Sequence, residues 1–238
     1  MLRKSIAYAL HAVLVFQFIS ACATAPKEKI TADINAPSLL AVEISSEFSE
    51  RYFDETHAEN FARKFGGDAV PALIVLMEKN DTNIPKGKVA IYLGKLADSR
   101  AVVPIQEFIK NSIDTYISED AYLDLAFALR ALGLIGDEAS LEYLRIGTTR
   151  EFWNKTNSAF TIPELNLDHD VAVQAMREAA LRGYASSGKK SVVDDLSAHP
   201  DAFNDFPTHL YQEALKEARR RYSKEQFSTP WHSESTTK

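Results

Sequence analysis

The chain has 238 residues, of which 45% are hydrophobic and 25% are charged, and these are ordinary proportions for a globular protein. Its 33 acidic residues exceed its 27 Lys and Arg residues, so the formal net charge is −6 at pH 7. An acidic chain has no general electrostatic attraction for nucleic acid, which argues against DNA or RNA as its partner. With only nine Gly and nine Pro, and with little of the alternation typical of strands, the sequence predicts an all-α fold.

The first 21 residues have the features of an export signal. Arg3 and Lys4 give it a basic start, and Ile6–Ile19 is mostly apolar but shorter than the roughly 20 apolar residues that a stable membrane span needs. The segment ends in Ile19-Ser20-Ala21-Cys22, which resembles the lipobox of bacterial lipoproteins, where a small residue precedes a cysteine that becomes acylated. The resemblance implies cleavage before Cys22 and attachment of a diacylglycerol group to its sulfur atom.

Cys22 is the only cysteine in the chain, so acylation explains its presence and no disulfide is expected in the fold. The alternative is an ordinary secretory signal, because Ala21-Cys22-Ala23 also satisfies the small-x-small rule for cleavage. Ala23, rather than Asp, after the cysteine resembles the sorting signal for the outer membrane in enterobacteria. We therefore expect a lipid-anchored protein of the bacterial cell envelope, on the periplasmic side of the outer membrane.

Residues 22–37 are predicted to form a flexible tether, because they contain two prolines, alternating charges and little that can be buried. The folded domain is expected from residue 38 to residue 222, and residues 223–238 are expected to form a C-terminal tail. A helix within Ser38–Phe53 is predicted to cap the N-terminal end of the domain. A helix over Thr208–Tyr222 is predicted to cap its C-terminal end.

The stretch Leu125–Leu144 predicts two helices joined by a two-residue turn. Four apolar residues of the first helix recur at spacings of four, three and three, which places them on one side of an α-helix: Leu125, Leu129, Leu132 and Ile135. Gly136 is expected to end this helix, because glycine adopts a positive φ without strain, and Asp137 to cap the next helix. Gly133 is small enough to allow a neighbouring helix to come close.

The same pattern recurs along the chain. Leu93–Asp98 matches Leu132–Asp137 at a distance of 39 residues, and Gly188 matches Gly136 at a distance of 52 residues. Self-similarity at a period of about 30–50 residues is typical of helical solenoids. Other expected features are an N-cap at Thr56 for a helix that runs to Phe65, a hairpin turn within Gly67–Ile74, an N-cap at Ser118, and helices over Asp168–Ser187 and Ser191–Ala198.

Two stretches carry a family resemblance. They are Val89–Ile109, with Leu93-Gly94 and Asp98-Ser99-Arg100-Ala101-Val102-Val103-Pro104, and Leu125–Leu144, with Leu132-Gly133 and Gly136-Asp137-Glu138-Ala139. They resemble HEAT repeats, of the short variety first described in phycobilin lyases and common in bacterial proteins. The resemblance implies a short right-handed α-solenoid of about four to five helical hairpins, with capping helices at both ends. It also implies a concave face lined by the second helix of each hairpin. Because HEAT arrays mostly bind other proteins, it implies a protein partner rather than lyase chemistry.

Candidates for catalysis, metal binding or nucleotide binding are few. Asp168-His169-Asp170 combines two carboxylates and an imidazole, but adjacent side chains point in different directions, so we expect Asp168 to cap the following helix and His169 to be exposed. Gly183–Ser191 resembles a phosphate-binding loop, yet Lys190 stands where such a loop needs Ser or Thr, and a helix rather than a strand is expected before it. No motif of a serine nucleophile is present. The sequence therefore predicts no catalytic residue, no metal and no cofactor.

Two further segments have more than one interpretation. Thr148–Leu167 interrupts the repeat and is predicted to be irregular; its apolar residues Phe152, Trp153, Phe160 and Ile162 suit either a packed insertion or a binding loop. Arg219-Arg220-Arg221 is expected near the end of the last helix, where cations favour the negative end of the helix dipole. A contact with anionic lipid head groups or with an acidic partner is the alternative for these arginines.

The remaining polar positions of the second helices are the predicted contacts with a protein partner: Gln106, Lys110, Glu142, Arg145, Asp194 and Asp195. Phe152 and Trp153 are the predicted contacts of the insert. The sequence thus leads to the hypothesis of a membrane-anchored scaffold, not an enzyme, that holds an unidentified envelope protein. One alternative is an accessory or enzymatic factor that binds a small envelope ligand through residues 148–167. Another is a structural part of a larger secretion or outer-membrane complex.

Overall fold

The computed structural model describes residues 55–79, 84–114, 116–157 and 159–228, which all belong to one compact unit, residues 38–238. The predictions for the signal segment, Cys22, the tether and the helix within Ser38–Phe53 lie outside the described residues. The end of the predicted tail, from residue 229, lies outside them as well.

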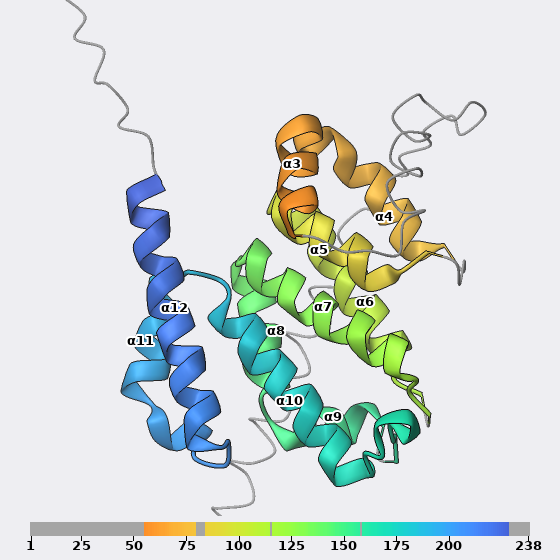
Figure 1. Ribbon diagram of the computed structural model, residues 1–238, viewed down its shortest axis with the longest axis vertical. Coiled ribbons are helices and arrows are strands. Elements are labelled where there is room, and N and C mark those ends of the chain that lie inside the picture. The colour runs from red at the N-terminus through yellow and green to blue at the C-terminus, as the bar shows by residue number, and fades with distance from the viewer. Residues whose placement is uncertain (1–54, 80–83, 115, 158, 229–238) are drawn as a thin grey trace, which may run out of the picture. The chain divides into compact units, whose positions relative to one another are not determined.

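Within these ranges the fold is all-α, as the composition predicts, and two isolated bridges are the only pairing between extended segments (Figure 1). No helix in this part of the chain has both the length and the apolar character that crossing a membrane requires. The helices are α3 (Glu55–Phe65), α4 (Val70–Glu78), α5 (Lys86–Leu96), α6 (Val102–Asn111), α7 (Glu119–Ile135), α8 (Glu138–Gly147), α9 (Arg150–Thr156), α10 (His169–Ala185), α11 (Lys190–Ala198) and α12 (Thr208–Ser228). Short 3₁₀ turns occupy Gly66–Ala69, Ser99–Ala101, Pro163–Leu165 and Pro200–Phe203.

Helix α7 lies at the centre of the fold, because it packs most extensively against α5 on one side and against α10 on the other (Figure 1). Helix α3 packs beside α5, and α12 packs beside α10 and α11. The shorter second helices pack against this row: α4 on α5, α6 on α7, and α8 on both α7 and α10. Fully buried side chains from both sets of helices, such as Leu129 of α7 and Leu144 of α8, form one apolar core.

Three glycines allow the central helices to come very close together. A Cβ atom built at Gly133 of α7 would lie 1.8 Å from the carbonyl oxygen of Gly183 in α10, and one built at Gly183 would lie 2.5 Å from the carbonyl oxygen of Leu129. Gly94 of α5 faces α7 in the same way, because its Cβ would lie 2.9 Å from the Cα atom of Ala131. The close approach predicted for Gly133 is therefore confirmed.

The repeat in the sequence corresponds to a repeated turn geometry. Gly136 ends α7 with a φ of 63°, and the Oδ1 atom of Asp137 accepts a hydrogen bond from the backbone N–H of Ser140 at 2.8 Å, as a cap of α8. Both features agree with the prediction. In the preceding hairpin the matching position is Ala97, with a φ of 51°, and Asp98 follows it as a cap. A side chain with a Cβ atom is strained in this left-handed region, so Ala97 adopts the turn at a cost.

Two details at the ends of the fold differ from the prediction. Helix α3 begins at Glu55, so Thr56 lies inside the helix and not at its cap. Helix α12 continues to Ser228, beyond the predicted end at Tyr222. Arg219-Arg220-Arg221 therefore lies within the helix, more than a turn before its negative end, and the expected dipole contact is not made.

The insert Thr148–Leu167 is a packed part of the domain. Its first half forms α9, where the prediction was an irregular stretch, because Thr149 caps a helix that the periodicity alone did not indicate. Trp153, Phe160 and Ile162 are fully buried. For these three residues, the interpretation as a packed insertion fits, and the interpretation as a binding loop does not.

Gly133→Ala is expected to destabilise the fold strongly, because the added methyl group would overlap the backbone of Gly183 and force α7 and α10 apart. We expect the free energy of unfolding, measured in urea, to fall by about 3 kcal/mol, the upper end of the usual cost of overpacking. The control is Gly67→Ala, whose Cβ would have no heavy atom nearer than 3.8 Å and whose effect should stay within about 0.5 kcal/mol. Equal effects of the two substitutions would contradict the importance of this crossing.

Ala97→Gly is expected to stabilise the fold, because glycine takes the left-handed conformation without a Cβ clash. The gain should be about 0.5 kcal/mol, since glycine also gives the unfolded chain more freedom. The reverse change at the matching position, Gly136→Ala, should cost about 1–2 kcal/mol. Urea denaturation of both variants beside the original chain measures the two effects, and a loss of stability in Ala97→Gly would refute the strain at this turn.

Candidate functional site

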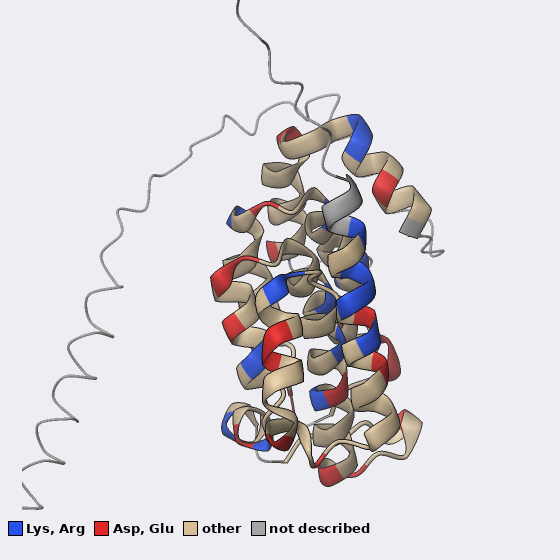
Figure 2. Ribbon diagram, turned by 90° about the vertical axis from the view of Figure 1, so that its left-hand side faces the viewer, with Lys and Arg blue, Asp and Glu red and all other residues tan. Residues whose placement is uncertain are grey.

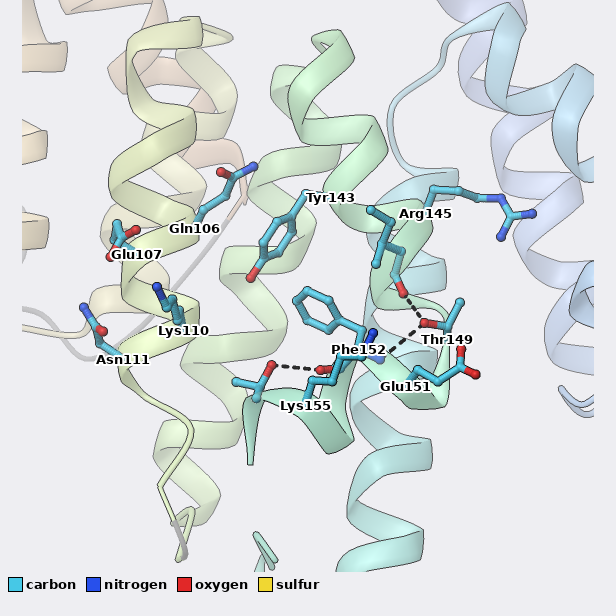
Figure 3. A pocket seen from close by; sticks show the side chains of 12 residues that line it. Gln106, Glu107, Lys110, Asn111, Tyr143, Arg145, Thr149, Glu151, Phe152 and Lys155 are labelled. Carbon is cyan, nitrogen blue, oxygen red and sulfur yellow. Dashed lines mark hydrogen bonds between the residues drawn. The ribbon is translucent and has the colours of Figure 1, made fainter. Parts of the chain in front are cut away.

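An open groove with a volume of about 830 Å³ lies between α6, α8 and α9 (Figure 3). We call it the α6–α8–α9 groove. Helix α6 contributes Gln106, Glu107, Lys110 and Asn111, helix α8 contributes Tyr143, Arg145 and Ile146, and the insert contributes Thr149, Glu151, Phe152, Lys155 and Thr156. The groove therefore lies where the second helices of two hairpins meet the insert.

The position of α9 is fixed by its N-cap residue, Thr149, and by Trp153. The Thr149 hydroxyl donates a hydrogen bond to the carbonyl oxygen of Ile146 at 2.7 Å and accepts one from the backbone N–H of Phe152 at 3.4 Å. The indole N–H of Trp153, which is fully buried, donates to the carbonyl oxygen of Gly147 at 2.7 Å. These bonds hold the first turn of α9 against the end of α8. As a result, Phe152, which precedes Trp153 in the chain, lies at the groove (Figure 3).

Aromatic rings form the floor of the groove. The ring centroids of Tyr143 and Phe152 lie 5.2 Å apart at an angle of 81°, and those of Phe152 and Trp153 lie 4.8 Å apart at 85°. Edge-to-face pairs of this kind contribute about 0.5–1.5 kcal/mol beyond the apolar area that they bury. Ile146 extends the floor with a side chain that is 46% exposed. The result is an apolar surface that is held rigidly and reaches solvent.

The hydroxyl of Tyr143 is directed toward the α6 side of the groove (Figure 3). Burial raises the pKa of Tyr143 well above its usual value, and the negative charge of Glu107 raises this pKa further. The phenol therefore stays protonated at physiological pH and offers both a donor and an acceptor of hydrogen bonds.

Charges of both signs line the rim. Glu107 and Lys110 are exposed on α6, and Glu151 and Lys155 are exposed on α9. Among the described residues, none of these four side chains makes an ion pair. An apolar floor inside a polar rim is the usual anatomy of a protein-binding surface.

Four of the predicted contact residues meet at the groove: Gln106, Lys110, Arg145 and Phe152. The Arg145 side chain lines the groove, but its guanidinium group points away toward α11 (Figure 3). Its Nε atom donates to the carboxylate of Asp195 at 2.8 Å, and the guanidinium lies 4.6 Å from the centroid of the Phe203 ring. Arg145 thus joins α8 to the segments after α10.

The other predicted contacts lie elsewhere. Glu142 is exposed on α8 but does not line the groove, and Asp194 pairs with Lys190 on its own helix at 2.6 Å. Asp195 accepts hydrogen bonds from Arg145 and from the hydroxyl of Tyr184, the latter at 3.1 Å. Asp195 therefore makes contacts inside the molecule, whereas the prediction assigned it to a partner.

Trp153 needs a correction as a contact residue. Its side chain is fully buried and its only polar atom is bonded to Gly147, so it offers no surface to a ligand. The residues that the sequence prediction missed are mainly Tyr143 and Ile146. Tyr143 lies between Leu141 and Leu144 of the apolar stripe, and Ile146 follows that stripe by two residues. The placement of α9 beside them makes this surface one wall of the groove. Glu107 and Asn111 neighbour predicted residues on α6 and follow from the same helical face.

The metal-like cluster is divided among three separate contacts. Asp168 caps α10, as predicted, and Asp170 pairs with Arg150 at 2.7 Å. His169 is half-buried where the prediction had it exposed; its ring nitrogens lie 3.1 Å from the carbonyl oxygen of Phe160 and 3.2 Å from the side-chain oxygen of Asn154. Across the described residues, no group of three His, Cys, Asp or Glu side chains is arranged to hold a metal ion.

Comparison of the chain with protein-family models, with curated proteins and with solved structures gave no match. The function is therefore argued from the geometry of the groove and from the sequence.

Trp153→Ala is expected to lower the free energy of unfolding by about 3–5 kcal/mol, the range found when a large aromatic side chain is removed from a core. The reason is that the substitution leaves a cavity beneath α9 and deprives the carbonyl oxygen of Gly147 of its donor. Urea denaturation followed by circular dichroism measures the change. The control is Glu151→Gln on the same helix, which is exposed and should be nearly neutral. Unchanged stability in Trp153→Ala would show that α9 is not anchored by this residue.

Proposed function

We propose that this chain is a lipid-anchored scaffold of the bacterial cell envelope that holds another envelope protein in the α6–α8–α9 groove. The observation that carries the proposal is the floor of Tyr143, Phe152 and Ile146, which stays apolar and accessible inside a rim of charges that form no ion pairs with the described residues. Protein interfaces concentrate their binding energy in such central aromatic and aliphatic groups and use the charged rim for orientation.

The wider architecture supports an extended binding face. The hairpins α5–α6 and α7–α8 share one turn geometry, and the first helices α3, α5, α7 and α10 pack side by side in one row. This arrangement is what a short α-solenoid of HEAT-like repeats, right-handed and with capping helices, requires. Each of the second helices α4, α6 and α8 exposes an aliphatic side chain: Val75, Val103 and Ile146, respectively. We assign the second-helix row to the face that meets the partner.

The shape and charge of the groove suit an amphipathic helix of the partner. Such a helix places apolar anchors at every third or fourth position, and one of these would lie on Tyr143 and Phe152. Its flanking positions would carry both signs of charge, with acidic groups opposite Lys110 and Lys155 and basic groups opposite Glu107 and Glu151. The hydroxyl of Tyr143 would hydrogen-bond to a polar group of the partner.

The place of the protein in the cell follows from the sequence alone. The apolar segment ending at Ala21 and the single Cys22 support acylation of the cysteine sulfur, which would anchor the domain to the membrane through residues 22–37. Each buried CH₂ group of an acyl chain contributes about 0.8 kcal/mol to this anchoring. Anchoring would confine the groove to the envelope and raise the effective concentration of envelope partners.

A second candidate function is supported by the volume of the groove. A cavity of about 830 Å³ lies within the range that binds small molecules, and one wall comes from the insert. A small envelope ligand that stacks on Phe152 would fit this description. The groove is open to solvent and its rim carries charges of both signs, and both features favour a protein partner over a small ligand.

The test is a crosslinked pull-down from intact cells, read by mass spectrometry, with the original chain, Ile146→Asp and Leu123→Asp. Ile146 and Leu123 are exposed to a similar degree, 46% and 44%, but only Ile146 lines the groove. A charge in the apolar floor should reduce capture of the partner at least about tenfold, which corresponds to roughly 1.4 kcal/mol. Capture by Leu123→Asp should be unchanged.

Further outcomes separate the proposals. Cys22→Ala should release the chain from the membrane fraction, and retention in that fraction would refute the lipid anchor. Equal capture by both aspartate variants, or no stoichiometric partner at all, would reject the groove as a protein-binding site. In that case, small-molecule binding that is lost in Phe152→Ala would support the second function.

A further inference from the structure

A second cavity, with a volume of about 400 Å³, lies where the C-terminal half of α12 passes the ends of other helices. We call it the α12 cleft. Five separate parts of the chain line it: Glu59 of α3, Lys95 of α5, Leu134 of α7, the turn Ser186–Gly188, and Arg220, Arg221 and Lys224 of α12. Figure 2 shows Lys and Arg residues gathered along this half of α12. Neither the predicted contact residues nor the α6–α8–α9 groove includes this cleft.

The charges in the cleft do not balance. Four cationic side chains line it, and Glu59 is the only carboxylate among the lining residues. Glu217, which bonds to two of the arginines, brings the acidic groups to two. Among the residues whose side chains the structure describes, four positive charges and two negative charges leave an excess of two positive charges, in a chain whose formal net charge is −6. The cleft is therefore positively charged, although the chain as a whole carries a negative net charge.

Three of the cations are held in place by carboxylates. Arg220 donates from Nε and Nη2 to the two carboxylate oxygens of Glu217, both at 2.7 Å, and Lys95 donates to Glu59 at 2.8 Å. The Nε atom of Arg221 also donates to Glu217. The hydrogen bonds from Arg220, then those from Arg221, lower the pKa of Glu217 to about 2, so this carboxylate remains charged at any physiological pH. The network thus orders the guanidinium groups before any ligand arrives.

Other donors remain unused. Among the residues whose side chains the structure describes, the two terminal nitrogens of Arg221 make no hydrogen bond, and Lys224 makes none. The Arg221 side chain is only 21% exposed. Because no buried side-chain nitrogen in the described part lacks a partner, the terminal nitrogens of Arg221 are open to solvent, and the cleft is the cavity that this side chain lines.

We propose that the α12 cleft binds a phosphate group. The two terminal nitrogens of a guanidinium group form parallel hydrogen bonds to two phosphate oxygens, and an ammonium group adds a compact charge without a fixed direction. Arg221 and Lys224 are the direct contacts, and Arg220 and Lys95 supply the surrounding field. A phosphate monoester and the head group of an anionic phospholipid share this chemistry. The proposal does not depend on the α6–α8–α9 groove or on its partner.

The experiment uses the full chain in micelles of a neutral detergent. Isothermal titration calorimetry with inorganic phosphate measures binding of the free anion. Native mass spectrometry of mixed micelles containing either phosphatidylglycerol or phosphatidylcholine measures retention of lipid. The variants are Lys224→Gln, which removes an exposed cation without an ion pair, and Arg221→Gln combined with Lys224→Gln. The control is Lys79→Gln combined with Arg182→Gln, which removes two exposed cations outside both the cleft and the groove and so changes the net charge equally.

We expect binding to weaken about threefold in Lys224→Gln and at least about tenfold in the double cleft variant, because the bidentate contact is the stronger one. The control should bind like the original chain. Binding of inorganic phosphate would identify a soluble phosphate compound as the ligand, whereas retention of phosphatidylglycerol alone would identify a lipid head group. The proposal is overturned if neither probe binds, or if the cleft variants and the control lose binding equally.

Discussion

The close crossing of α7 and α10 is the constraint on which the rest of the structure depends. At Gly133 and Gly183 the two backbones are so near that neither position has room for a Cβ atom. Because α8 follows α7 through a two-residue turn, this crossing also places α8 against α10. The packing of these helices therefore depends on the two glycines at this crossing, and larger side chains fill the space around it.

A buried cation connects this central packing to both candidate sites. Arg177 of α10 is 3% exposed; its Nε atom donates to the carbonyl oxygen of Thr148 at 2.8 Å, and a terminal nitrogen bonds to Asp205. Its guanidinium group also lies 4.6 Å from the centroid of the Phe206 ring. Thr148 immediately precedes the cap of α9, and Asp205 and Phe206 immediately precede α12. Arg177 thus fixes both the segment that leads into α9, at the groove, and the segment that leads into α12, at the cleft.

The sequence predicted those parts of the fold that depend on local chemistry. Ser118, Asp137 and Asp168 were predicted as caps and accept the expected hydrogen bonds, and Gly136 has the expected positive φ. Parts that depend on tertiary contacts were not predictable in this way. Ala97 takes a left-handed turn that its own preference opposes, and the position of α9 depends on a buried indole that bonds to Gly147. The candidate site divides in the same way. The helical pattern predicted Gln106 and Lys110, whereas Tyr143 belongs to the site only because α9 packs beside it.

The two candidate sites should respond differently to their surroundings. The groove relies on an apolar floor of Tyr143, Phe152 and Ile146, and hydrophobic contact depends little on ionic strength. The α12 cleft relies on an excess of positive charge, and the interactions of exposed charges weaken beyond a Debye length of about 8 Å at physiological salt. Arg221 is largely shielded from solvent, so its contact with an anion is screened less than that of Lys224. Moderate salt should therefore remove the contribution of Lys224 first, while occupation of the groove persists.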